Sequence, residues 1–228
     1  MPHEEILSKI VEIHQRTKAL MILAEEIDVR FNTFLQPGNE QRHVLEHIMR
    51  AQAAELGILS GKDEAYIEKN YDKALGHAYR AFFDTADWLG WALRKKISDI
   101  LKPSSRKIIS DLIKPYSNEC IMACLPNYYS EIRPKLEHLN RDIAAIRARK
   151  DIGDSDNLLT EVTAYSDTIQ ELLDFIEHIT KSIPAMEEWN KRNKRTTRRK
   201  RLWDIILVLI GVGFGALLAW LKLSGPSD

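Results

Sequence analysis

A short stretch near residue 45 combines the side chains that acid–base and metal chemistry use. Residues 41–51 read QRHVLEHIMRA, with two histidines and a glutamate inside five positions. On a helix, His43 and His47 lie one turn apart and could share a metal ion, with Glu46 as the general base. The third ligand that such a site needs would have to come from elsewhere in the chain. We predict neither a metal site nor a cofactor.

Arg42 and His47 offer a second chemistry, because an arginine can hold a phosphate while a histidine transfers a proton. The run Arg42-His43-Val44-Leu45-Glu46-His47 resembles the Arg-x-x-x-x-His motif of the HEPN superfamily, including a polar residue directly after the arginine. The resemblance implies a small helical bundle and a metal-independent ribonuclease that pairs two such motifs across a dimer cleft. Arg42 and His47 would then be the catalytic pair, and RNA the substrate.

The stretch has a counterpart further along the chain. Residues 45–51, LEHIMRA, and 75–81, LGHAYRA, share the pattern Leu-x-His-x-x-Arg-Ala, which puts a histidine and an arginine on one helical face. If the two helices pack antiparallel, these side chains would form one polar seam, since buried cations require partners. A salt-bridge layer that fixes helix register is favoured, with a ligand-binding or regulatory site as the alternative. The predicted cluster is His43, His47, Arg50, His77, Arg80 and Asp84.

Helical periodicity predicts an all-α body of about six helices, some of them long. Apolar residues recur at spacings of three, four and seven, and no segment alternates as a strand would. The predicted helices span about 6–34, 39–56, 63–101, 104–124, 127–150 and 158–182. Pro37-Gly38, Gly57, Pro103 and Pro126 separate them, and Pro184 is expected to interrupt the last one. Residues 1–190 form this helical domain, with 151–157 as a possible inner boundary.

The C-terminal part predicts a single membrane span, residues 202–222. Residues 205–221, IILVLIGVGFGALLAWL, carry no charge, and with 202–204 the run reaches the ~30 Å of a bilayer's hydrocarbon core. Trp203 and Trp220 bracket the run, where aromatic rings prefer the two interfaces. Gly211, Gly215 and Ala219 recur every four residues, a spacing that lets two membrane helices approach closely.

The charges predict how this span is oriented. The first 190 residues hold 24 of the 33 bases and 31 of the 33 acids, whereas residues 191–201 hold eight bases and no acid. Bases that flank a span stay on the cytoplasmic side, so the helical domain is expected in the cytosol and the tail, residues 223–228, across the membrane. The basic neck, residues 191–201, is expected to contact anionic lipid headgroups, through Lys194, Arg195, Arg198, Arg199, Lys200 and Arg201.

These features favour an interaction protein over an enzyme. We expect a tail-anchored, single-pass membrane protein whose cytosolic helical domain binds a second copy of itself or another protein at the membrane surface. A homo-oligomer is the expected assembly. The alternative is a membrane-tethered HEPN-like ribonuclease, or a defence or stress effector of that kind, which would use Arg42 and His47.

Overall fold

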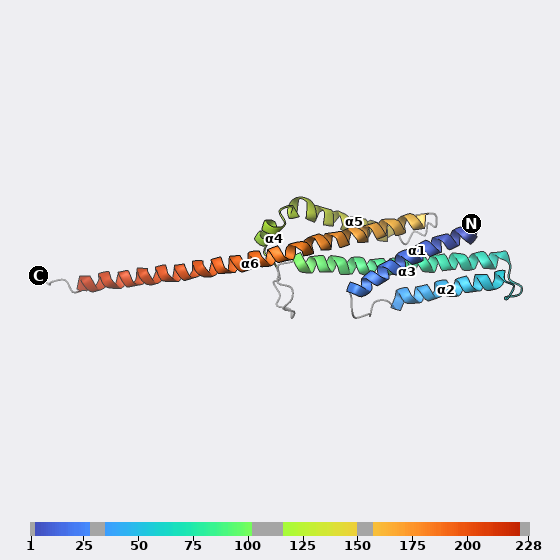
Figure 1. Cartoon of the computed structure of the whole chain (residues 1–228), viewed down its shortest axis with the longest axis horizontal. Coiled ribbons are helices and arrows are strands. Elements are labelled where there is room, and N and C mark those ends of the chain that lie inside the picture. Colours follow the sequence, from blue (N-terminus) through green and yellow to red (C-terminus); the bar gives the residue numbers. More distant parts are fainter. Residues whose placement is uncertain (1–2, 28–34, 102–115, 150–156, 224–228) are drawn as a thin grey trace.

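The computed structural model describes residues 3–27, 35–101, 116–149 and 157–223. Every element in these ranges is helical, which confirms the all-α prediction for this part of the chain (Figure 1). The elements are α1 (His3–Ile27), α2 (Leu35–Glu55), α3 (Glu64–Leu101), α4 (Asn118–Cys124), the π-helical turn η1 (Tyr128–Ile132), α5 (Arg133–Arg149) and α6 (Leu158–Leu223).

Helix α3 is the centre of the bundle. Helices α1 and α2 lie along its N-terminal half, and the first part of α6 covers its C-terminal half (Figure 1). Helices α5 and α4 pack on α6. The apolar stripe of α3 explains this position, because it buries residues all along the helix. The fully buried side chains of the core include Ile13, Phe82, Phe83, Leu89, Leu93, Ile97, Ile143, Ile169 and Leu172.

Helices α2 and α3 form an antiparallel hairpin, as the predicted polar seam requires. Gly57 and Gly61, in the connection, have φ angles of 69° and 74°, a left-handed conformation that glycine adopts without a steric penalty. Asp63 begins α3 as its cap, because its Oδ1 accepts a hydrogen bond from the backbone N–H of Tyr66 at 3.0 Å. The hairpin brings Glu40 beside His77, and His47 beside Asn70.

A buried tyrosine, Tyr165, fixes the crossing of α3 with α6, where Arg147 of α5 also contacts α3. Tyr165 on α6 donates a hydrogen bond to Asp87 Oδ1 on α3 at 2.8 Å, and Arg147 Nε on α5 lies 3.2 Å from the same oxygen. Gly90 permits the close approach, since a Cβ at that position would meet Ile169 Cδ1 at 3.3 Å. Burial and the neighbouring Asp87 carboxylate raise the pKa of Tyr165, so its hydroxyl stays a hydrogen-bond donor.

The predicted start of the second helix is wrong. Pro37 and Gly38 were expected to separate the helices, but α2 begins at Leu35 and contains both residues. Proline is tolerated in the first helical turn, because its missing N–H would have no intrahelical acceptor there. Helix α1 ends at Ile27 in the structure, and residues 28–34 lie outside the described ranges. Of the helix predicted at 104–124, the structure describes residues 116–124, where α4 begins at Asn118.

The predicted interruption at Pro184 is also wrong. Helix α6 runs through Pro184 and continues to Leu223. Pro184 and Thr180 are both exposed, so the Thr180 carbonyl, which loses its helical partner, can be hydrated instead. Water thus offsets part of the cost that proline imposes inside a helix. The last part of α6 leaves the bundle as a single long helix (Figure 1).

None of the helices that the structure describes has an apolar stretch long enough to cross a membrane. That finding concerns the described side chains only, and those of Gly211 and of residues 213–223 are not among them. The predicted membrane-helix packing residues Gly211, Gly215 and Ala219 therefore lie outside the described side chains.

Candidate functional site

Glu40 is the centre of a polar cluster at the seam between α2 and α3. We name it the histidine cluster; its members are Glu40, His43, His47, Asn70, His77 and Arg80. Glu40 is only 7% exposed. Its Oε2 lies 2.7 Å from His77 Nδ1 and accepts a hydrogen bond from Arg80 Nε at 3.1 Å. Gln36 Nε2, one turn earlier on α2, donates to Glu40 Oε1 at 3.2 Å.

The electrostatics of the cluster keep Glu40 ionised. Burial raises the pKa of its carboxyl, but hydrogen bonds and charges from His77 and Arg80 outweigh burial and hold that pKa below its usual range. His77 cannot satisfy both of its close neighbours. Its Nδ1 lies 2.7 Å from the Glu40 carboxylate and 2.8 Å from Arg80 Nη2, yet a carboxylate only accepts and a guanidinium only donates.

Two further imidazole rings gather around His77. The His47 ring stacks on it at 5.3 Å between centroids with an interplanar angle of 15°, and the His43 ring meets it edge-on at 4.9 Å. Asn70 donates from Nδ2 to the Tyr66 carbonyl, so its Oδ1 faces His47 Nδ1 at 2.9 Å as an acceptor. His47 therefore carries its hydrogen on Nδ1, and Asn70 orients the ring.

Of the residues predicted for the cluster, the structure brings together His43, His47, His77 and Arg80. Arg50 instead forms an ion pair with Glu46, one turn earlier on the exposed side of α2. Asp84 lies one turn beyond Arg80 and is partly buried.

Sequence reasoning missed Glu40 and Asn70. A signal for Glu40 was present, because it precedes His43 by three residues and His47 by seven, and such residues share one face of a helix. Asn70 carries no comparable signal.

The ribonuclease hypothesis requires Arg42 and His47 to face one phosphate. Residues five apart on a helix point about 140° away from each other. Arg42 is exposed, whereas His47 faces Asn70 on α3. No contact joins the two side chains within the described ranges. The catalytic roles of Arg42 and His47 stay a prediction, to which this geometry adds no support.

The last part of α6, residues 191–223, leaves the bundle (Figure 1), and we call it the free part of α6. The basic neck lies at its start. Lys194, Arg195, Arg199 and Arg201 are exposed there, as lipid contact would require. The side chains of Arg198 and Lys200 lie outside the described set. Lipid contact itself remains a prediction.

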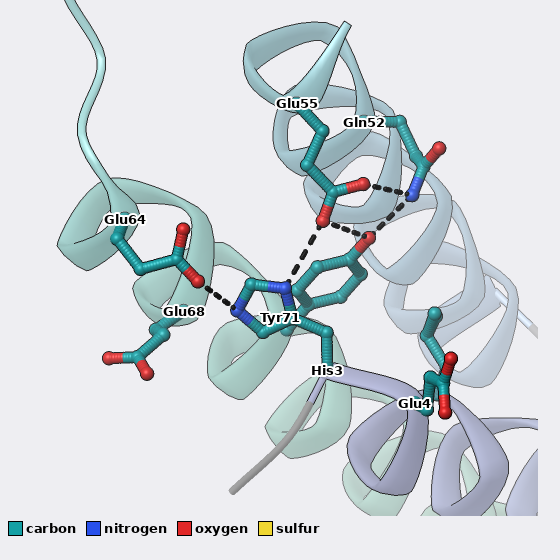
Figure 2. A pocket seen from close by; sticks show the side chains of 8 residues that line it. His3, Glu4, Gln52, Glu55, Glu64, Glu68 and Tyr71 are labelled. Carbon is teal, nitrogen blue, oxygen red and sulfur yellow. Dashed lines mark hydrogen bonds and ion pairs between the residues drawn. The ribbon is translucent and has the colours of Figure 1, made fainter.

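A second polar site, which sequence reasoning missed, lies where the ends of α1, α2 and α3 meet. We name it the acidic pocket; it has a volume of about 430 Å³ and is lined by His3, Glu4, Leu7, Gln52, Glu55, Glu64, Glu68 and Tyr71. Figure 2 shows the His3 ring between two carboxylates from different helices. Its Nδ1 lies 3.3 Å from Glu55 Oε1, and its Nε2 lies 3.0 Å from Glu64 Oε1.

Tyr71 forms the floor of the acidic pocket. It is fully buried, and its hydroxyl donates to Glu55 Oε1 at 3.1 Å while accepting a hydrogen bond from Gln52 (Figure 2). Burial and the Glu55 carboxylate raise the pKa of Tyr71. Both nitrogens of His3 can donate to carboxylates only when the ring is protonated, so the two contacts are ion pairs only in that form. The sequence gives no sign of this pocket, because Glu55, Glu64 and Glu68 approach His3 only through tertiary packing.

No family model, curated protein or solved structure matches this chain.

Proposed function

We propose that this chain is a membrane-tethered protein whose helical bundle works at the cytosolic surface of the membrane. The observation that carries the proposal is the free part of α6, which leaves the bundle (Figure 1) and exposes its apolar side chains. The exposed fraction of these side chains lies between 59% and 66% for Leu202, Trp203, Ile205, Leu207, Val208, Leu209, Ile210 and Val212.

These side chains point in every direction around the helix. Residues 207–210 are consecutive, and each lies about 100° around the axis from the one before. A protein partner covers one stripe of a helix, whereas lipid covers all of its sides. Burying a Val, Leu or Ile side chain contributes about 1.5–3 kcal/mol, so a bilayer would stabilise this segment more than a partner on one side could. The uncharged sequence continues to Leu221, which supports a span at 202–222.

The basic neck supports the cytosolic side for the bundle. Its exposed bases stand directly before the apolar run, where an anionic membrane surface contributes about 1 kcal/mol for each Lys or Arg near it. The bundle before residue 191, by contrast, has more acids than bases. Anionic lipid would repel this acidic surface. The repulsion favours an arrangement in which the basic neck separates the bundle from the membrane.

At the membrane, the bundle is proposed to bind a second copy of the chain or another protein. The spacing of Gly211, Gly215 and Ala219 supports pairing of the membrane helices. On the bundle, α2 offers an apolar outer face, since Leu45 and Met49 lie one turn apart and are 58% and 56% exposed. Two weak contacts on one tethered chain reinforce each other, because the first raises the effective concentration for the second.

Vesicle flotation tests the tether. The full chain should float with vesicles that contain anionic lipid and resist extraction with alkaline carbonate, whereas a chain ending at Arg201 should float weakly and be released by high salt. The truncated chain keeps the basic neck, so the comparison separates insertion from headgroup attraction. The proposal fails if both chains are released alike.

A further inference from the structure

The histidine cluster contains three side chains whose types and positions suit a transition-metal ion. We propose that Glu40, His43 and His77 bind one divalent ion of the Zn²⁺ type at the seam between α2 and α3. One ligand atom from each residue lies within 4.8 Å of the other two. This site is independent of the membrane tether.

The ligand types select the class of ion. Two imidazole nitrogens with one carboxylate oxygen form a set that Zn²⁺ uses in proteins, with bonds of about 2.0–2.2 Å. Ligand atoms at that bond length and tetrahedral angles are about 3.4 Å apart. The three ligand atoms of the cluster all lie within 4.8 Å of one another, so small side-chain movements would bring them to that spacing. Ca²⁺ and Mg²⁺ prefer oxygen ligands throughout, and a site with two imidazoles disfavours them.

His43 provides an independent sign of a ligand. Its Nδ1 is buried and has no hydrogen-bond partner among the described residues. Buried polar atoms in folded proteins are nearly always paired, and an orphan indicates an ion or a water molecule that completes the site. His43 follows Glu40 by three residues on α2, a spacing that places both side chains on the same face toward His77.

The position of Arg80 indicates where positive charge belongs. Its guanidinium contacts both Glu40 Oε2 and His77 Nδ1, although His77 Nδ1 cannot accept from Arg80 and donate to Glu40 together. A metal ion would satisfy the lone pair of Nδ1 and the carboxylate at once. The Arg80 side chain is 50% exposed, so it can turn into solvent. Arg80 therefore competes with the metal ion for Glu40 and His77. His47, which Asn70 holds and which stacks on His77, is a residue that positions the His77 ring.

Metal binding would strengthen the attachment of α2 to α3. Two of the ligands lie on α2 and the third on α3, and α2 packs mainly against α3. An ion that binds the folded chain more tightly than the unfolded one raises the midpoint of thermal unfolding. The proposed site therefore has two readouts, affinity and thermal stability.

The test uses the full chain in detergent micelles, freed of metal with a chelator and titrated with Zn²⁺ against a fluorescent zinc indicator. We expect one Zn²⁺ bound through the cluster, and His43→Ala, His77→Gln and Glu40→Gln should each weaken its affinity at least tenfold. Arg80→Gln should tighten binding, because it removes the competing cation. A variant that only damaged the fold would not bind Zn²⁺ more tightly than the wild type does. Zn²⁺ should raise the Tm of the wild type, but not that of His77→Gln.

The acidic pocket provides the matched control, because His3, Glu64 and Glu68 also have ligand atoms within 4.8 Å of one another. A His3→Gln chain should bind Zn²⁺ at the cluster as tightly as the wild type does. The proposal is overturned if His3→Gln abolishes the binding that His77→Gln leaves intact. It is also overturned if the wild type binds no more Zn²⁺ than the His43→Ala, His77→Gln double variant, or if Arg80→Gln weakens binding.

Discussion

Replacing Val208 and Val212 with arginine is expected to move most of the chain from the carbonate-resistant membrane fraction to the soluble one. Both side chains are exposed on the free part of α6, at 64% and 66%. An arginine near the centre of a membrane helix costs about 3 kcal/mol. Two would cost about 6 kcal/mol, which lowers the partition constant on the order of ten-thousand-fold. Carbonate extraction followed by immunoblotting measures the change.

A control variant with two added arginines in the basic neck tests whether the added charge alone causes the change. Asn193→Arg with Thr196→Arg adds the same charge outside the apolar run and should leave the chain in the membrane. Val208→Leu with Val212→Leu, which keeps the apolar surface, should do the same. An arginine pair at 208 and 212 that stays carbonate-resistant would show that residues 202–222 do not enter the bilayer.

Replacing Tyr165 with alanine is expected to lower the free energy of unfolding by about 4 kcal/mol, a typical cost for removing a buried aromatic ring. Tyr165 is fully buried and packs against the rings of Phe82 and Phe83, at 6.4 and 5.6 Å between centroids. Its removal leaves a cavity where α3 crosses α6 and strips the hydroxyl partner from Asp87. Urea denaturation of the full chain in micelles, followed by circular dichroism, measures the loss.

Tyr165→Phe separates the ring from its hydroxyl. The ring stays, and Asp87 keeps its ion pair with Arg147, so this change should cost only about 1 kcal/mol. Equal costs for the alanine and phenylalanine variants would mean that the hydroxyl, and not the packed ring, holds α6 against α3. A domain of this size has roughly 5–15 kcal/mol of stability, so the alanine variant removes a large share.

Local sequence determined the elements of this protein and many of their ends. Apolar residues at helical spacing are enough to predict α3, because that pattern reflects burial along one face. Gly57 and Asp63 mark the end of α2 and the start of α3 by backbone conformation and by capping, which are properties of single residues and their neighbours. The shared pattern around His47 and His77 likewise indicated that two helices would meet.

Only the tertiary structure decided which side chains meet across those helices. Glu40 becomes the centre of the histidine cluster because the hairpin register places it against His77 and Arg80, thirty-seven and forty residues away. His3 reaches Glu55 and Glu64 because three helix ends converge. Pro184 stays helical because its turn faces solvent. Helical periodicity reports which face of a segment is buried, but the partner of that face depends on packing between segments far apart in the chain.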